Sequence, residues 1–600
     1  MKPHSLFTPP RRPRRRPLSR HAPRLRPLLT MCLLLSIPIG RLDAQSDGSW
    51  GQAFRHDPSG GGEFWGANYL DTANPQKVFE AINVVLIPTG PNAGKVLVFD
   101  RTQLPPVQGR NNHIQRWSIV QIDPDIGVPA IFQNFSLPLP ADEGDFFCSG
   151  HAWMDDGRLF LAGGTAYTNL PCRLDGIRLA YIYNPNVTPV RNGQWFEQPD
   201  MDRPRWYPTV THLGDPLDRM VVSGGVNCTG GACTPPCPSP DTANNTYEVF
   251  IPGTPIAGWE SIGPVRVWSG PRPGGTDPLG VYPRLSSLSE RALGGLPGTL
   301  TTRLFMAGMN TLSASVDHVS SPGNWNGPQK RQSPSANPPI THKDYGAALL
   351  FPGLQDVVLH VGGTDNNGNV LTSVESIDNK LIENPPPQTP PIQWNAVAGL
   401  NRPRSRLNAV ILPDATVLVT GGWSSPNSCS TGAECPEQQA ELYENGSWRL
   451  LPAEASPRTY HSVSILLPTG KVLTGGGDTR TWDYQVFSPP YMFKPNRPVW
   501  VSWPTTDLAY DTPYSATFES LPLGVEIEKV VLIAPGSTTH HSDMHQRYVS
   551  LEVESSESDT VTFRTPKNRT YAPRGWYMLF LVTNSKLPSE GKFVKIVGLP

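Results

Sequence analysis

Short apolar segments alternate with turns along most of this chain, and they recur as one repeating unit. The unit is an apolar strand, a turn often written Pro-x-Gly or Asp-x-Gly, a second apolar strand and a glycine pair. Seven copies occupy residues 83–100, 151–164, 209–225, 303–309, 347–363, 408–422 and 462–477. Most copies start about 54 to 68 residues after the one before, with a longer interval before the fourth copy, which is also the most degenerate.

Repeats of this length are typical of the kelch type of β-propeller, in which each unit forms a four-stranded blade. The glycine pairs would allow the backbone to pack closely where the innermost strands crowd the axis. We therefore predict an all-β protein with a seven-bladed kelch-type β-propeller over residues 45–490. Stacked β-sandwiches are the alternative, and the regular glycine pairs argue against them.

The repeat stops at about residue 490. The remaining strands alternate without double glycines, as in KVVLIAPG, YVSLEVE and YMLFLVTN, which predicts a C-terminal immunoglobulin-like β-sandwich over residues 491–600. One loop of this part, residues 536–546, carries His540, His541 and His545. Such a concentration of histidines is unusual for a plain surface loop.

The first 44 residues have a different composition. Arginines crowd residues 11–26, an apolar run follows at 28–40, and Leu42-Asp43-Ala44 offers a small-residue cleavage site. This order predicts an export signal peptide over residues 1–44 and a secreted protein. A nucleic-acid-binding arm is the alternative, but such an arm does not need the Leu-rich segment. The apolar run is too short to span a bilayer comfortably, so we expect no transmembrane anchor after cleavage.

The near-neutral net charge of −1 depends on this leader. Taking ten basic residues (Lys2 and nine arginines) and Asp43 from totals of 50 and 51 leaves 40 basic and 50 acidic residues, or −10. A mature acidic chain without another basic run is a poor candidate for binding nucleic acid or an anionic membrane.

Seven of the eight cysteines lie beyond the leader, and an odd number leaves one unpaired. Cys429 and Cys435 bracket a short loop, so we predict that they pair. A further cluster consists of Cys172, Cys228, Cys233 and Cys237, which can form two disulfides in three ways. The cluster lacks the paired CxxC spacing of a zinc site. The cysteine left over is Cys148.

Four stretches carry chemistry: Cys148 in DFFCSGH, Tyr207 in RPRWYPT, Tyr460-His461 in PRTYHS and His540 in GSTTHH. The first three precede inner strand pairs, so a propeller would bring them to one end of its axis. Neighbours such as Tyr460 and His461 point to opposite faces of a regular strand. They reach one ligand only from an irregular strand entrance, which Pro457 favours. Taken alone, each would be a strand-end tyrosine or a buried, satisfied histidine.

These stretches resemble the motifs of the copper-radical oxidases, the family of galactose oxidase and glyoxal oxidase. FCSG resembles the family's cysteine motif, RWYPT its crosslinked-tyrosine motif, RTYHS its tyrosine-histidine motif and GSTTHHSDMHQR its late histidine motif. Family members combine a kelch propeller with a C-terminal sandwich, so the resemblance covers nearly the whole mature chain. No N-terminal sugar-binding domain like that of galactose oxidase is evident, which favours the glyoxal oxidase branch.

The resemblance implies a thioether bond between Cys148 and Tyr207, and one copper ion held by Tyr207, Tyr460, His461 and His540. Imidazole and oxygen ligands suit Cu(II). It implies that Tyr460 is the base that takes the substrate hydroxyl proton, and that the Tyr207 radical takes a hydrogen atom from carbon. His541 competes with His540 as the ligand. We prefer His540, because in the family the ligand follows the Gly-x-x-Thr stretch directly.

One departure concerns the aromatic ring stacked on the modified tyrosine. Galactose oxidase places a tryptophan just after the glycine pair of that blade, where this chain has Val226-Asn227. Trp268 or Trp325 is a candidate to supply the ring from elsewhere.

The expected function is a secreted, monomeric oxidase. It would convert small aldehydes, as hydrates, or primary alcohols with O2 into the oxidised product and H2O2, with peroxide-consuming enzymes as possible partners. The alternative is a propeller that binds a glycan or a protein and has no catalytic role.

Overall fold

The structure is a computed structural model that describes most of the chain beyond the predicted leader. The described residues are 47–55, 81–99, 114–122, 129–139, 144–167, 174–187, 193–215, 217–226, 247–252, 282–292, 300–307, 312–317, 325–330, 345–365, 367–379, 394–424, 435–477, 483–505, 507–569 and 571–598. The predicted signal peptide, Trp268, Cys429 and the cluster of four cysteines lie outside them, as does the Trp325 side chain. Among these residues no helix is both long and apolar enough to cross a membrane.

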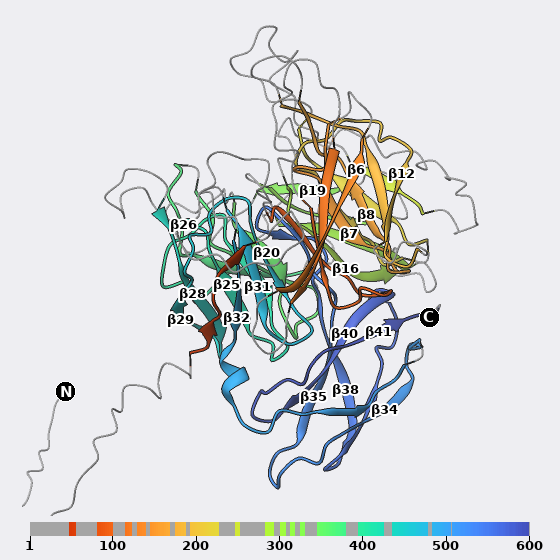
Figure 1. The fold of residues 1–600 in the computed structure, drawn as a ribbon, viewed down its shortest axis with the longest axis vertical. Helices are drawn as coiled ribbons and strands as arrows, with labels where there is room; N and C mark the ends of the chain where they lie inside the picture. The colour runs from red at the N-terminus through yellow and green to blue at the C-terminus, as the bar shows by residue number, and fades with distance from the viewer. Residues whose placement is uncertain are drawn as a thin grey trace, which may run out of the picture. The chain divides into compact units, whose positions relative to one another are not determined.

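Nearly all regular structure is β, and six sheets each contain the four consecutive antiparallel strands of a propeller blade (Figure 1). The first two sheets are β3 (Asn83–Leu86), β4 (Val96–Phe99), β5 (Ile114–Ile122) and β6 (Pro129–Pro138), then β7 (Gly150–Trp153), β8 (Leu159–Ala162), β11 (Ala180–Asn184) and β12 (Gln194–Gln198). The next two are β16 (Leu285–Ala292), β17 (Leu300–Met306), β18 (Leu312–Asp317) and β19 (Trp325–Lys330), then β20 (Ala347–Leu350), β21 (Val357–Val361), β22 (Val374–Asp378) and β23 (Asn395–Val397).

The last two of the six sheets complete the series. They are β24 (Asn408–Ile411), β25 (Val417–Thr420), β28 (Gln439–Glu444) and β29 (Ser447–Ala453), then β30 (Ser462–Leu466), β31 (Val472–Gly476), β32 (Asp483–Ser488) and β1 (Ser49–Trp50). Strand β1 and the neighbouring β2 (Phe54–Arg55) pair with β32. The start of the described chain therefore completes the last sheet of the repeat.

A further sheet has three described strands, β13 (Thr209–His212), β14 (Met220–Ser223) and β15 (Tyr247–Phe250). First strands of neighbouring sheets pack together: β7 contacts β13, β13 contacts β16, β24 contacts β30 and β30 contacts β3. Two short ladders stand beside the blades, β9 (Thr165–Tyr167) with β10 (Leu174–Gly176) and β26 (Trp423–Ser424) with β27 (Cys435–Pro436). The predicted propeller is thus confirmed, while a ring of seven complete blades stays a prediction.

The glycine pairs occur where one sheet meets its neighbour. Gly163 and Gly164 have φ values of +72° and +143°, and a Cβ on Gly164 would lie 2.1 Å from the Asp145 carbonyl oxygen. A Cβ on Gly421 would lie 2.6 Å from the Arg458 carbonyl oxygen, in the segment that leads into the following sheet. Only glycine fits both the backbone conformation and the space, which is the close backbone approach that the repeats predict.

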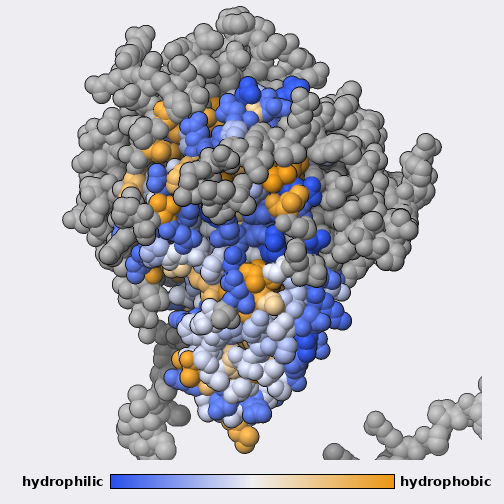
Figure 2. All heavy atoms as spheres, turned by 90° about the vertical axis from the view of Figure 1, so that its right-hand side faces the viewer, coloured by the Kyte–Doolittle hydropathy of each residue, from blue (hydrophilic) through white to orange (hydrophobic). Residues whose placement is uncertain are grey.

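The C-terminal part begins with a short 3-10 helix, η5 (Pro490–Phe493), and forms a separate β-sandwich-like unit around its own apolar core. Its strands are β33 (Trp500–Ser502), β34 (Pro513–Phe518), β35 (Ile527–Ile533), β38 (Tyr548–Ser556), β39 (Thr560–Arg564), β40 (Gly575–Thr583) and β41 (Lys592–Ile596). Strand β38 pairs with both β39 and β35 and so joins the two halves. The predicted C-terminal sandwich is confirmed at this level. On the face shown in Figure 2, hydrophobic residues of the described part form small groups among polar ones.

A hairpin from this sandwich joins the first blade. Strands β36 (Ser537–Thr539) and β37 (Ser542–Asp543) pair with each other, and β36 pairs with β3 in the register Asn83↔Thr539. The Ser537 hydroxyl lies 2.6 Å from Nδ1 of His151 in the next blade. The Asp543 carboxylate accepts hydrogen bonds from the amides of Ser537 and His545. This hairpin therefore places His540 beside the inner strands.

A second link between the two parts contains titratable groups. Asp155, in the turn between β7 and β8, pairs with Arg574 at 2.5 Å, and His212 Nε2 lies 2.8 Å from Asp218. The three groups Asp155, His212 and Asp218 lie close enough to hold a metal ion. We assign contacts within the protein instead, since Arg574 already engages Asp155 and Asp218 already engages His212. Burial, followed by the charge of Asp218, raises the pKa of Asp155 to about 7.

This raised pKa predicts that stability falls as pH rises. Between about pH 4 and 7 the folded protein keeps a proton on Asp155 that the unfolded chain loses, so raising the pH lowers the free energy of unfolding. In the wild type the free energy of unfolding should fall between pH 4.5 and 7.5, and we expect Asp155→Asn to make this fall smaller by about 1 to 3 kcal/mol. Denaturant unfolding at the two pH values measures the free energy of unfolding of each protein. The matched control is Asp156→Asn in the same turn, and equal slopes in the wild type and Asp155→Asn would contradict the assignment.

Candidate functional site

Six residues with a left-handed backbone stand at the entrances to successive first strands of the sheets. Their φ values lie between 44° and 64°, and they are Cys148, Tyr207, Tyr282, Tyr345, Arg406 and His461. Such values are uncommon for residues other than glycine, so their recurrence indicates one shared local conformation. The Tyr207 amide donates to the Cys148 carbonyl at 3.0 Å, and the Tyr282 amide donates to the Tyr207 carbonyl at 2.7 Å. These bonds hold the same position of consecutive blades together.

A buried arginine fixes several of these entrances. Arg205 lies two residues before Tyr207, donates to the Gly224 carbonyl at 2.6 Å and pairs with Glu248 at 3.1 Å. Arg404 and Arg458 repeat this arrangement with the Gly421 and Gly476 carbonyls and with Glu441 and Glu454. A buried charge needs such a partner, so the Pro-Arg pairs in the sequence determine where the chain turns toward the site.

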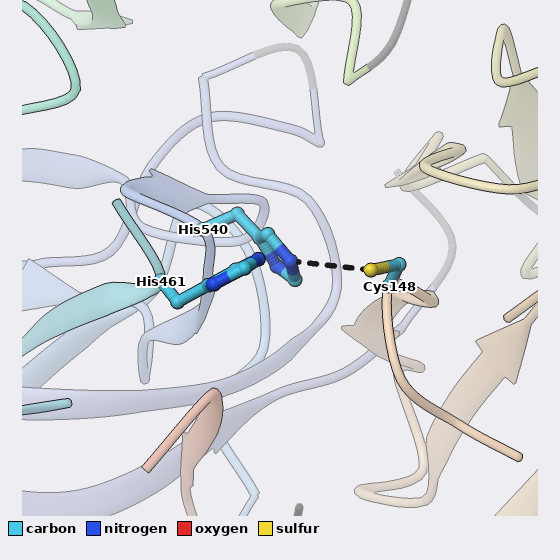
Figure 3. A group of neighbouring side chains, drawn as sticks. All are labelled: Cys148, His461 and His540. Carbon is cyan, nitrogen blue, oxygen red and sulfur yellow. Dashed lines mark hydrogen bonds between the residues drawn. The ribbon is translucent and has the colours of Figure 1, made fainter. Parts of the chain in front are cut away.

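Three of the predicted residues meet in one group. Nε2 of His540 lies 3.3 Å from the Cys148 sulfur, and the rings of His461 and His540 are 4.4 Å apart between centroids (Figure 3). One donor atom from each of Cys148, His461 and His540 lies within 4.8 Å of the other two. Cys148 is buried and free, as expected for the cysteine without a partner.

The two predicted tyrosines complete the group. Tyr207 and Cys148 belong to one buried cluster, and Tyr460 packs against it with its ring centroid 6.4 Å from that of Tyr207. The Tyr207 ring lies 5.0 Å from the His540 ring, and the Tyr460 ring lies 4.2 Å from that of His461. Tyr460 and His461 both precede β30, and the left-handed backbone of His461 turns two adjacent side chains to the same region. The structure thus brings all five predicted site residues together.

Hydrogen bonds to His540 determine which nitrogen faces the group. Nδ1 lies 2.6 Å from the Thr539 hydroxyl and 3.2 Å from the Tyr282 hydroxyl. Tyr282 in turn donates to the Ser149 carbonyl at 3.1 Å, so its oxygen is free to accept from Nδ1–H. This arrangement leaves the lone pair on Nε2, which points at Cys148 and His461. An acceptor for the N–H of the far nitrogen is the usual support of a metal-binding histidine, and here hydroxyl oxygens take that place.

Burial favours the neutral forms of Cys148, Tyr207, Tyr460 and His540. It raises the pKa of Cys148 and of Tyr207 well above their ordinary values, and it lowers the pKa of His540 well below its ordinary value. The pKa of Tyr460 is also raised, first by burial. Two phenols and the His540 imidazole therefore lie together without a charge of their own. A bound cation would favour the phenolate forms, so this donor set fits a metal such as Cu(II).

The other two histidines of the loop lie elsewhere. His541 is 3% exposed, and its ring lies 5.8 Å from Tyr460 and 6.3 Å from Tyr345. Neither of its ring nitrogens has a hydrogen-bond partner among the described residues. His545 lies 6.2 Å from the His212 ring. Of the three, His540 is the one that contacts Cys148.

Two aromatic residues contact Tyr207 that no motif in the sequence indicates. The Trp206 ring centroid lies 4.1 Å from that of Tyr207, tilted by 42°, and Tyr282 lies 5.0 Å away. Sequence neighbours on a regular strand point apart, which argues against a contact between Trp206 and Tyr207. The left-handed backbone of Tyr207 brings the two rings together. Tyr282 could have been found by aligning the repeats, since it has the same position in the next blade.

Known proteins share both parts of this chain. Residues 497–596 match the family model "Galactose oxidase-like, Early set domain". The galactose oxidase of Gibberella zeae is 24% identical over 469 residues, which are 75% of this chain and 61% of that protein. An aldehyde oxidase of Arabidopsis thaliana is 30% identical over 224 residues, which are 32% of this chain and 36% of that protein.

The same arrangement of strands occurs in a solved structure. It is that of a fungal alcohol oxidase of the AA5 family in complex with copper, with a TM-score of 0.62 and 19% identity. The match covers 92% of this chain and all of that one, and at this identity it shows the fold. The chain spans about three fifths of the length of the galactose oxidase that it matches. Taken with the family model and the sequence matches, these findings identify this chain as a homologue of galactose oxidase and of the plant aldehyde oxidases.

Proposed function

We propose that this protein is a secreted copper-radical oxidase of small aldehydes, taken as hydrates, or primary alcohols. It would use O2 as the oxidant and release H2O2. The observation that carries the proposal is the convergence of Cys148, Tyr207, Tyr460, His461 and His540 in one buried group, although they span nearly 400 residues of sequence. The names of the relatives, galactose oxidase and aldehyde oxidase, support the same class of substrate.

Copper would be held by the two phenol oxygens of Tyr207 and Tyr460 and by ring nitrogens of His461 and His540. When bound, the ion accepts one electron and favours the ionised phenols, which suits Cu(II) with nitrogen and oxygen ligands. The contacts of His540 support Nε2 as its ligand atom. Thr539 and Tyr282 would then act as positioning residues, because they orient the imidazole without touching the substrate.

The chain's own groups would perform the proton and hydrogen transfers. Tyr460, ionised beside the cation, takes the proton of the substrate hydroxyl. The Tyr207 radical takes a hydrogen atom from the neighbouring carbon. The substrate would lose two electrons in all: the Tyr207 radical would accept one with the hydrogen atom, and bound copper would supply the acceptor for the other. O2 then takes up two electrons and two protons and leaves as H2O2.

The proposed Cys148–Tyr207 thioether would make Tyr207 easier to oxidise than an ordinary tyrosine. The burial of both side chains in one cluster supports it, because Cys148 and Tyr207 each contact the same His540 ring. Trp206 and Tyr282 enclose the ring and would shield the radical from solvent.

The domain organisation remains part of the proposal. We propose a signal peptide at 1–44, a ring of seven blades over 45–490 and a sandwich over 491–600. The pairing of β1 and β2 with β32 supports ring closure, since it joins the start of the described chain to its last repeat. The pairing of Cys429 with Cys435 is likewise proposed, because Cys429 lies outside the described residues.

The crosslink is the feature to test first. After aerobic copper loading, we expect the intact protein to be lighter by about two hydrogens, and the tryptic peptides with Cys148 and Tyr207 to migrate as one species under reducing conditions. Peptide mapping by mass spectrometry measures both, and Cys148→Ser, which cannot form the bond, is the control. Separate peptides with a free thiol and an unmodified tyrosine would refute the radical cofactor and would favour a propeller that only binds a glycan or a protein.

A further inference from the structure

A second polar cluster adjoins the proposed copper site on the side of Tyr460. It consists of Tyr345, Arg406, Trp423 and His541, and no step proposed above uses it. The guanidinium carbon of Arg406 lies 4.9 Å from the Tyr460 ring centre, 5.0 Å from that of Tyr345 and 5.6 Å from that of Trp423. Cation–π contacts with three rings hold this charge in a fixed place.

The backbone also fixes Arg406. It has the left-handed conformation of the site-facing residues, and its amide donates to the Tyr345 carbonyl at 2.7 Å. Ser405 and Trp423 exchange two backbone hydrogen bonds of 3.0 Å, which holds the third ring beside the arginine. Arg406, Tyr345 and Trp423 are all half-buried, whereas His541 is buried beneath them. Arg406 is therefore partly open to solvent, whereas His541 is not.

His541 adds an unsatisfied group to the cluster. A neutral imidazole always carries one N–H donor, and leaving a buried donor unpaired costs about 1 to 3 kcal/mol. Neither ring nitrogen of His541 has a hydrogen-bond partner among the described residues, although the side chain is almost fully buried. Arg406 and His541 flank the same two rings, those of Tyr345 and Tyr460. An acceptor that carries negative charge would therefore suit the guanidinium and the imidazole together.

We propose that Arg406 and His541 form an anion-binding subsite that selects substrates with a carboxylate next to the reacting aldehyde or alcohol carbon. The proposal rests on the oxidase function proposed above and narrows its substrate class. The reacting carbon would lie at Tyr460 and Tyr207, and the carboxylate would lie toward the guanidinium. Charge-assisted hydrogen bonds to a carboxylate are the strong ones, so this contact would determine specificity.

The test compares two aldehydes of similar shape. Glyoxylate carries a carboxylate beside its aldehyde, and methylglyoxal has a methyl group in place of one carboxylate oxygen. In the copper-loaded protein we expect Arg406→Leu to lower the ratio of kcat/KM for glyoxylate to that for methylglyoxal about 10- to 100-fold, mainly through KM. Arg406→Lys should give a ratio between those of the wild type and Arg406→Leu, because lysine keeps the charge but lacks the planar guanidinium. Arg402→Leu, an exposed arginine of the same segment, is the matched control and should leave the ratio unchanged.

The alternative role for Arg406 is to favour the ionised form of Tyr460. Loss of that effect would slow both substrates alike, so a ratio that stays within about twofold in Arg406→Leu would overturn the subsite. A binding measurement without turnover separates this result from failure of the oxidase function. In a Tyr207→Phe background, isothermal titration with glyoxylate should show about 10- to 100-fold weaker binding after Arg406→Leu, and roughly tenfold weaker binding after His541→Ser. If glyoxylate binding depends on Arg406 but the copper-loaded protein with Tyr207 intact oxidises no glyoxylate, the subsite stands and the oxidase function is refuted.

Discussion

Replacing Tyr207 with phenylalanine is expected to abolish turnover by roughly a thousandfold or more while copper still binds. The substitution keeps the ring between Trp206 and Tyr282 but removes the oxygen that would carry the radical and bind the ion. Tyr460, His461 and His540 remain as donors, so the copper affinity should fall by much less than the rate. Oxygen uptake measures turnover, and metal analysis after dialysis measures bound copper.

Tyr443→Phe is the matched control for this experiment. Tyr443 is half-buried in β28, and its ring contacts are with Phe351 and Trp448 rather than with the site. We expect it to leave the rate within about twofold of the wild type. Turnover that survives in Tyr207→Phe would refute the radical role of Tyr207, whatever the state of the copper.

The fold could be predicted largely from the spacing of apolar strands and glycine pairs. The period and composition of the repeats predict the type of blade and a close backbone approach at the glycine pairs. The structure shows this close approach at Gly163-Gly164 and at Gly421. The hairpin β36–β37 was not predictable in this way. Its pairing with β3 depends on contacts between Thr539 and Asn83, which are 456 positions apart in the sequence. Neither strand carries a local signal for the other.

The site was predictable where a residue type is chemically unusual. An odd cysteine and a Tyr-His pair before a strand are visible in the sequence, and these became Cys148, Tyr460 and His461. Tyr282, Tyr345 and Arg406 have no unusual neighbours and were not identified. They share only a left-handed backbone conformation and a place in the repeat. The identity of a residue other than glycine or proline does not predict its φ angle. A position-by-position alignment of the repeats would have exposed them.

The choice between the adjacent histidines of the loop can be settled by removing each in turn. His540→Ala deletes the imidazole that lies 3.3 Å from Cys148, whereas His541→Ser deletes a ring that faces Tyr345 and Tyr460. Loss of an outer-shell partner typically lowers metal affinity 10- to 100-fold, so loss of a direct ligand should cost roughly a hundredfold or more. We therefore expect His540→Ala to lose copper and His541→Ser to retain it. Competition with a chelator of known affinity measures both.

A misfolded variant would also lose copper, so the design needs a measure of folding and a graded substitution. Both variants should keep the wild-type circular dichroism spectrum, since His540 and His541 lie at the tip of a hairpin that Asp543 and the β3 pairing hold independently of their rings. Thr539→Val removes one hydroxyl from Nδ1 of His540 and should weaken copper about tenfold without abolishing it. The reverse order, with His541→Ser losing the metal and His540→Ala keeping it, would transfer the ligand role to His541. The anion subsite would then have to be abandoned as well, because the unpaired nitrogens of His541 would be accounted for by the metal.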